Sequence, residues 1–297
     1  MGEVKHIPVM LQEVLYYLNL APGKIIVDAT VGTGGHSEKI IERVLPGGRV
    51  ICIDRDEEIL KIAQERLSPF GDTVRFIYGN FEDLDGILQG CSISRVDGIL
   101  FDLGVSSYHL ESPERGFSFQ LEGPLDMRLD RKSFISAYDL VNNLNEDEIK
   151  ALLRNFGQER YAGRIARMLV KERQLHPIET TRQLSEIVTR AVPVKYRHYR
   201  IHPATRTFQA VRIAVNRELE SLQMALEKAV SIMNRGGRLC VISFHSLEDR
   251  QVKLIFRRSA SLGLVKIVTP KPIYPKDEEV AINPRSRSAK LRVIERL

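Results

Sequence analysis

Short apolar runs alternate with amphipathic segments along the N-terminal third of the chain. The runs are residues 24–27, 49–53, 74–78 and 96–101. The segments between them carry apolar residues at helical spacing, as at Leu60, Ala63 and Leu67. Unbroken apolar runs are typical of parallel strands buried on both faces, so this part of the chain predicts a doubly wound α/β sheet.

The alternation stops after the fourth run. Between 109 and 205 no strand-like run is flanked by turns. A turn-rich loop over 111–130 precedes three amphipathic helical segments, two of which begin at Asn145 and Thr180, residue types that favour helix N-caps. We interpret this region as a small all-α domain inserted into the sheet domain.

The strand pattern returns near the C-terminus. A long helix over 206–233 is expected first, and further apolar runs follow at 236–243, 264–268 and 289–296. The chain therefore predicts an α/β fold with a mostly parallel, seven-stranded sheet and an all-α insert. The predicted domains are 1–110 together with 206–297 for the sheet, and 111–205 for the insert.

The turn after the first strand has the composition of a cofactor-binding loop. Asp28 ends the strand, and Gly32, Gly34 and Gly35 precede the next helix. A strand, a glycine turn and a helix form a nucleotide-type site at the carboxyl edge of a parallel sheet, where glycine lets the backbone approach a ligand. Asp54 ends the second strand, where an acid can accept ribose hydroxyls.

The glycine spacing by itself leaves two cofactor classes open. A dinucleotide fingerprint needs a third glycine where Ser37 stands, and NAD brings a pyrophosphate that must sit on a helix N-terminus. S-adenosylmethionine (AdoMet) has no phosphate and tolerates a looser turn. Asp54 serves either cofactor, so a NAD-dependent Rossmann oxidoreductase stays an alternative to an AdoMet enzyme at this point.

Two more polar groups follow strands that share this edge. Asp102 ends the fourth strand, which the reversal of strand order places beside the first. Its carboxylate can accept a hydrogen bond from a cofactor or a substrate amine, or cap its own loop. His245 follows the fifth strand, just before Ser246 and Asp249, whose spacing predicts a helix cap. His245 is therefore either a catalytic group or a structural histidine.

The composition is that of a reduced, cytoplasmic protein. The 297 residues are 43% hydrophobic and 28% charged, which suits one or two globular domains. The three cysteines show neither disulfide nor zinc spacing, and no acid or cysteine completes a metal site around His198 and His202, so we expect no metal. No apolar run approaches the about 18 residues of a membrane span, and no signal peptide is evident, so no membrane partner is expected.

A basic run over 190–217 indicates a polyanionic partner. It carries arginines and lysines without an acid, interleaved with Tyr196, Tyr199 and Phe208, in a chain of net charge +6. Arginines bind phosphates and aromatic rings stack on unpaired bases, although many charge runs are only solvated faces. A second basic cluster lies at 283–292. The predicted RNA contacts are Arg197, Arg200, Arg206, Arg285 and Arg287.

Several long strings stand out across nearly the whole chain, the insert included. They are HIPVML, GTGGHS, DLGVSS, RGFSF, GPLDMRLD, HPATRTFQAVRIAVNRELE, SFHSLEDR and NPRSRSAKLR. Together they resemble the bacterial 16S ribosomal RNA cytosine-N4 methyltransferases. The resemblance implies a class I AdoMet-dependent methyltransferase that modifies the exocyclic N4 of one cytidine in the decoding region of the small-subunit rRNA, with S-adenosylhomocysteine as product and no metal.

The resemblance also implies roles for single residues. Its cofactor residues would be Gly34, Gly35, His36, Asp54, Phe81, Asp102 and His109, to which the strand-turn pattern adds Asp28 and Gly32. Among them His36 would lie at the methionine end of AdoMet, Asp54 would bind the ribose and Phe81 would flank the adenine. At His109 this chain reads SSYHLE, where relatives more often have a Pro-Gln pair.

The expected chemistry is methyl transfer to a weak nucleophile. The N4 lone pair of cytosine is delocalised, so we expect the base to be unstacked and an N4 hydrogen to be held by an acceptor, with Asp102 first and His245 second. The remaining alternative is a non-catalytic RNA-binding or ribosome-assembly protein with a vestigial cofactor pocket. Nothing in the sequence indicates an oligomeric state.

Overall fold

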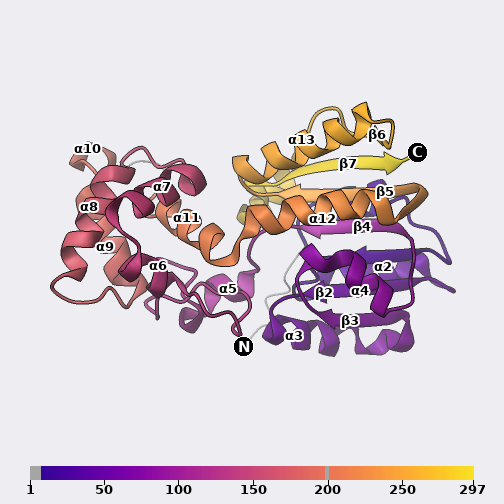
Figure 1. Cartoon of the computed structure of the whole chain (residues 1–297). Coiled ribbons are helices and arrows are strands. Elements are labelled where there is room, and N and C mark those ends of the chain that lie inside the picture. The colour runs from indigo at the N-terminus through magenta and orange to yellow at the C-terminus, as the bar shows by residue number, and fades with distance from the viewer. Residues whose placement is uncertain (1–7, 198–200) are drawn as a thin grey trace. The chain divides into compact units, whose positions relative to one another are not determined.

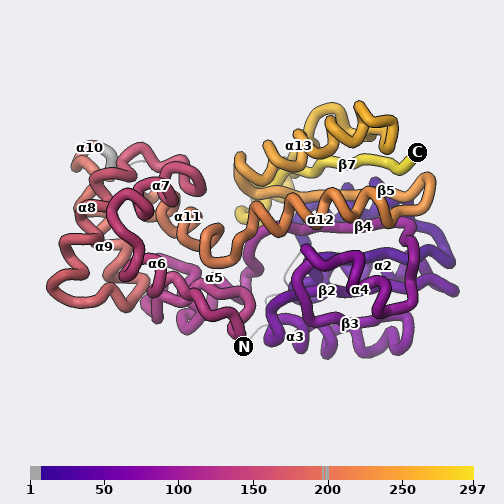
Figure 2. Tube along the Cα trace, in the orientation of Figure 1, coloured from indigo at the N-terminus to yellow at the C-terminus, as the bar shows by residue number. Residues whose placement is uncertain are grey.

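The chain divides into two compact units (Figure 1). The structure, a computed structural model, describes residues 8–197 and 201–297. The sheet unit comprises 1–104 and 219–297, and the helical unit comprises 105–218. Figure 2 follows the chain out of strand β4 (Val96–Asp102), through the helical unit and back into helix α12 (Glu218–Ile232). The helical unit therefore extends beyond the predicted insert of 111–205 at both ends.

The sheet unit is built on a single seven-stranded sheet in the order β3-β2-β1-β4-β5-β7-β6. Besides β4, its strands are β1 (Ile25–Asp28), β2 (Arg49–Asp54), β3 (Val74–Tyr78), β5 (Met233–Ser243), β6 (Val265–Ile267) and β7 (Lys290–Arg296). β7 runs antiparallel to β5 and β6, and the other neighbours are parallel. The predicted fold class is confirmed, and the order reverses where β1 pairs with β4.

Strand alternation explains why consecutive residues of the strands are apolar. Successive side chains of a strand point to opposite faces. Ile26 and Leu100 accordingly belong to the core on one face of the sheet, and Val27 and Ile99 belong to the core on the other. Helices cover both faces, so the consecutive central positions of these strands are apolar.

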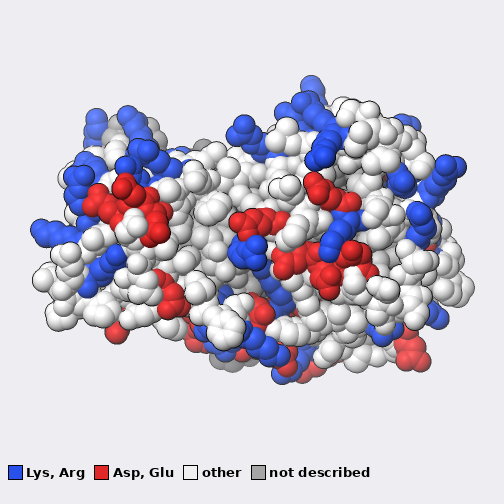
Figure 3. All heavy atoms as spheres, in the orientation of Figure 1, with Lys and Arg blue, Asp and Glu red and all other residues white. Residues whose placement is uncertain are grey.

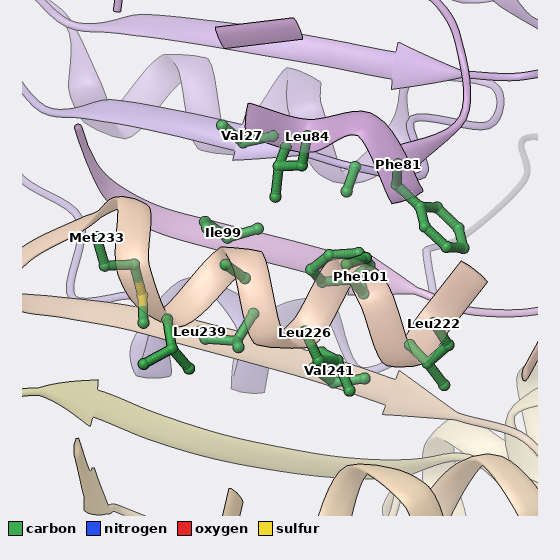
Figure 4. Close-up of a cluster of buried hydrophobic side chains, with 14 of the residues drawn as sticks. Val27, Phe81, Leu84, Ile99, Phe101, Leu222, Leu226, Met233, Leu239 and Val241 are labelled. Atoms are coloured by element: carbon green, nitrogen blue, oxygen red, sulfur yellow. The ribbon is translucent and has the colours of Figure 1, made fainter. Parts of the chain in front are cut away.

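The helices form two layers around the sheet. α1 (Leu11–Tyr17), α2 (Gly35–Val44) and α3 (Glu57–Leu67) pack on one face, and α4 (Leu84–Gly90), α12 and α13 (Ser246–Ser261) pack on the other. In Figure 4, Leu222 and Leu226 of α12 lie against Phe101 and Val241 of the sheet. Burying each large side chain contributes about 1.5–3 kcal/mol. This packing holds the carboxyl ends of the strands in place.

The helical unit has a core of its own. Its helices are α5 (Ser107–Glu111), α6 (Ala137–Asn143), α7 (Glu146–Gly157), α8 (Ala162–Arg173), α9 (Thr181–Ala191), α10 (Val194–Arg197) and α11 (Thr205–Asn216). No strand occurs among the described residues of this unit. Asn145 and Thr180 are the predicted N-caps of α7 and α9, each in a capping box. α14 (Asp277–Ile282), in the sheet unit, completes the helices.

The predicted single helix over 206–233 is wrong. The chain forms two helices, because Arg217 adopts the left-handed conformation, with φ 48°. The buried side chain of Asn216 holds this break: its amide nitrogen donates to the Met127 carbonyl at 2.7 Å, and its oxygen accepts from the Leu129 N–H at 2.8 Å. α11 therefore packs in the core of the helical unit, which includes Phe208 and Val211.

No helix in the described part of the chain combines the length and the hydrophobicity that a membrane crossing requires.

Candidate functional site

The glycine turn after β1 is closed by the carboxylate that ends β2. Asp54 accepts the Gly32 N–H at Oδ2 and the Asp56 N–H at Oδ1, each at 3.0 Å. Gly34 has φ 83°, which L side chains rarely adopt, and a Cβ on Gly35 would lie 2.6 Å from Cγ of Pro8. Asp54, predicted to bind a ribose, therefore also fixes the shape of the turn.

Asp28 is buried beneath this turn. Its Oδ2 accepts the Ser37 hydroxyl at 2.7 Å, and its Oδ1 accepts the Thr30 N–H at 3.3 Å. Burial raises the pKa of Asp28 to about 6; the charge of Asp54 also raises it, while the two hydrogen bonds lower it. These contacts tie the end of β1 to the first turn of α2. Contact between Asp28 and a cofactor stays a prediction.

Asp102 ends β4 at the point where the strand order reverses. Its N–H donates to Oγ1 of Thr30 at 2.7 Å, which joins the ends of β4 and β1. Its Oδ1 is buried and finds no hydrogen-bond partner among the described residues, although the side chain as a whole is 23% exposed. Burial, and then the charges of Asp28 and Glu248, raise the pKa of Asp102 well above its usual range.

His36 stands beside Asp102 in a defined orientation. Its Nε2 lies 2.9 Å from the Val9 carbonyl oxygen, and Nδ1 lies 3.6 Å from Oδ2 of Asp102. A carbonyl oxygen only accepts, so Nε2 carries the hydrogen and donates it. In the neutral ring the lone pair of Nδ1 therefore faces the carboxyl group. The family resemblance implies a cofactor contact for His36, which stays a prediction, and it did not indicate this pairing with Asp102.

Phe81 follows β3 at the same sheet edge. Its ring meets Phe101 of β4 edge to face, with centroids 5.5 Å apart. The preceding Asn80 donates to Oγ of Ser221 at 3.2 Å, and that hydroxyl donates to Glu82 at 2.6 Å. Ser221 lies 141 residues from Asn80 and 139 residues from Glu82 in the sequence, so no local motif predicts this network. Stacking of Phe81 beside an adenine stays a prediction.

The predicted cap of α13 is wrong. His245, not Ser246, is the N-cap: its Nδ1 accepts the Glu248 N–H at 3.3 Å, and Glu248 accepts the Phe244 N–H at 2.8 Å. Asp249 instead pairs with Arg292 of β7 at 2.7 Å. The buried Nε2 of His245 lies 3.2 Å from Oε1 of Glu248 and makes no hydrogen bond within residues 8–197 and 201–297. Its catalytic role stays a prediction.

His109 belongs to the helical unit, where its side chain stabilises the start of α5. Its Nδ1 accepts the Ser106 N–H at 3.1 Å and completes the capping box of α5. Its buried ring lies 4.9 Å from that of Phe117. The predicted contact between His109 and AdoMet stays a prediction.

The predicted RNA contacts have different surroundings. Arg206 is exposed and donates to the Gln158 carbonyl at 3.2 Å, whereas Arg197 donates to carbonyls at the end of α9. Arg285 and Arg287 of the sheet unit are exposed. Arg200 lies outside the described residues, as does His198. Figure 3 shows Lys and Arg atoms gathered at the α10 end of the helical unit, beside a group of acidic atoms.

Part of the basic run is neutralised by acids from outside it. Arg190 pairs with Glu172 of α8 at 3.1 Å, and Arg212 pairs with Glu218 through two contacts, at 2.9 and 2.8 Å. The lack of acids within the run therefore overstated its free positive charge, because folding brings partners from neighbouring segments.

Comparisons with known proteins were made over the whole chain. Residues 3–297 match the MraW methylase family. A protein of Geotalea uraniireducens named "Ribosomal RNA small subunit methyltransferase H" is 48% identical over 312 residues, which cover 100% of both chains. A protein of that name from Clostridioides difficile is 44% identical over 310 residues, which cover 99% of this chain and 100% of the relative. A solved putative rRNA-methylase from Clostridium thermocellum aligns with 98% of this chain and 99% of its own, at 14% identity and a TM-score of 0.49.

Proposed function

This chain belongs to the MraW methylase family, and on that premise we propose that it methylates the exocyclic N4 of one cytidine in the decoding region of 16S ribosomal RNA. It is an AdoMet-dependent methyltransferase, and relatives that match its full length are named for the small-subunit rRNA. The observation that carries the finer proposal is Asp102, a carboxyl group whose buried Oδ1 has no hydrogen-bond partner in the described part of the chain. The cytoplasm is the expected compartment.

The residues around the β1–β4 switch point fit AdoMet. When bound, AdoMet supplies an electrophilic sulfonium methyl group. The glycine turn and His36 would hold its methionine end, Asp54 would accept the ribose hydroxyls, and Phe81 would flank the adenine. An unpaired buried oxygen such as Oδ1 of Asp102 is the kind of group that a ligand satisfies.

Asp102 would act as the proton acceptor on the substrate amine. When N4 gains the methyl group it must lose one proton, and a carboxylate can accept that proton at Oδ1. A raised pKa makes Asp102 a stronger base than an ordinary aspartate. The lone pair on Nδ1 of His36 faces Oδ2 and would disfavour the ionised carboxylate relative to the protonated carboxyl group. His245 remains the second candidate for the acceptor, and no step requires a metal.

Mapping the product tests this function. The protein is incubated with AdoMet and small ribosomal subunits that lack the modification, and the rRNA is analysed by mass spectrometry. We expect a single N4-methylcytidine in the decoding region. Methylation of another base or another region would refute the proposed specificity, and the absence of any transfer would favour the assembly-protein alternative. Nothing in the site favours NAD, since Ser37 and not a third glycine follows the turn.

A further inference from the structure

The segment that leads into α6 carries a phenylalanine side chain that is almost fully exposed to solvent. Phe134 is 96% exposed, the most exposed large hydrophobic residue that the structure describes. Ile135 beside it and Tyr138 one turn later are also exposed. We call residues 131–135 the aromatic loop. Exposing a phenyl ring to water is unfavourable, and contact with a binding partner would remove that cost.

The aromatic loop is rigid at both ends. On its N-terminal side, Asp130 accepts the Lys132 N–H at 2.8 Å, and the Ser133 carbonyl accepts from Arg128 at 2.7 Å. On its C-terminal side, Ser136 caps α6 in a capping box with Asp139. The backbone on either side of Phe134 is thus fixed, and the ring is presented without a large entropy cost on binding.

The charges around the ring fit a polyanion. Arg131 and Lys132 are exposed and directly precede the apolar pair, whereas the nearby acids are less exposed. Asp126 is held by two contacts with Arg128, each at 2.8 Å, which help to keep its pKa below the usual range although burial opposes this. The exposed surface therefore combines Phe134, Ile135 and part of Tyr138 with two cations.

We propose that the aromatic loop binds unpaired bases of the RNA substrate, with Phe134 stacked on a base and Arg131 and Lys132 close to the flanking phosphates. Aromatic rings next to cations are the usual platform for single-stranded nucleic acid. This inference rests on the proposed function for its partner, and it adds a contact outside both basic clusters. A protein partner would need a broader apolar surface than one ring and its neighbours.

The chain contains no tryptophan, which allows a direct test. In Phe134→Trp the single indole reports stacking by loss of fluorescence. The matched control is Leu175→Trp, at a position of the same unit that is 71% exposed. We expect a 20-nucleotide single-stranded RNA of mixed sequence to quench the first variant and not the second, and duplex RNA of the same sequence to quench neither. Equal responses of the two variants would overturn the proposal.

A second measurement keeps binding apart from catalysis. Phe134→Ala is expected to weaken binding of this single-stranded RNA about tenfold, and Phe134→Trp to restore it. Unchanged affinity in Phe134→Ala would overturn the stacking contact. A fluorescence blue shift that depends on protein concentration alone would overturn it in favour of self-association. Methyl transfer to subunits, assayed on the same preparations, tests the proposed function independently, because stacking is measured without AdoMet.

Discussion

The turns after β1 and β4 lie side by side, and they treat their carboxylates in opposite ways. Asp28 is satisfied by its own surroundings, since Ser37 and Thr30 donate to its two oxygens. Asp102 leaves Oδ1 without a partner among the residues described, and its Oδ2 lies 3.6 Å from His36. The first carboxylate holds the backbone together. The carboxyl group of Asp102 has an oxygen, Oδ1, that can still accept a hydrogen bond from a ligand or a substrate amine.

Replacing Asp102 should have the largest effect on this contrast. Asp102→Asn keeps the shape and removes the base, so we expect kcat to fall about 10²–10⁴-fold at saturating AdoMet. The measurement is transfer of a labelled methyl group to small subunits. The variant should be at least as stable as the parent at pH 8, because ionising a carboxyl group whose folded pKa is raised costs free energy. A parental rate would remove Asp102 from the mechanism.

The pH dependence of the reaction tests whether Asp102 acts as the base. Asp102 must be ionised to accept a proton, and burial raises its pKa. The rate should therefore fall about tenfold per pH unit on the acid side, below a pKa well above that of an ordinary aspartate. The residual activity of Asp102→Asn should lack this acid limb. If the limb persisted in the variant, another group would be responsible for it.

Ser37→Ala tests the contribution of the hydrogen bonds that satisfy Asp28. It removes a donor from the buried Asp28, and we expect a loss of about 1.5–3 kcal/mol in the free energy of unfolding at pH 8. The folded pKa of Asp28 is raised, so stability falls as the pH rises through about 6, and losing Ser37 raises that pKa further. The loss should thus be smaller at pH 5 than at pH 8. Urea unfolding at both values measures it.

A matched serine controls for the general cost of losing a hydroxyl. Ser68 is exposed and its hydroxyl donates to the Glu65 carbonyl, so Ser68→Ala should change stability by less than about 0.5 kcal/mol at either pH. A loss in Ser37→Ala that did not depend on pH would mean that Asp28 does not change its protonation state between pH 5 and pH 8.

Gly34→Ala should have the smallest effect of the four. At φ 83° a Cβ is strained, and it would lie 3.3 Å from the Leu67 side chain, so we expect a cost of about 1–2 kcal/mol and weaker AdoMet binding. The control is Gly90→Ala in α4, where no described atom lies within 4 Å of the added methyl group. Thermal unfolding and calorimetric titration with AdoMet compare the two variants. Equal effects would show that the turn tolerates a side chain.

The strands were predictable because burial on both faces of the sheet requires consecutive apolar residues. The apolar run at 74–78 coincides with β3, and reversal of the strand order placed Asp102 beside the glycine turn as expected. The break at Arg217 was not predictable, because the helical spacing continues through it without glycine or proline. What ends α11 is Asn216, whose partners lie on a distant loop.

The misjudged polar residues share one cause. Ser246 looked like the cap of α13 because serine is a common N-cap, but the buried Glu248 selects His245 instead. The basic run over 190–217 contains no acid, but Arg190 pairs with Glu172 of α8, which lies outside the run. Local spacing reveals which groups a segment offers, and only the packed chain decides which of them are already used.

The serine at position 37 also limits how this site can change. Mutating it to glycine would complete a G-x-G-x-x-G spacing in one step, yet the same step would take the hydroxyl donor away from the buried Asp28. A protein that acquired this glycine alone would thus be less stable than its parent, unless Asp28 were replaced at the same time. The hydrogen bond from Ser37 to Asp28 therefore disfavours a change of this turn into a dinucleotide-binding turn.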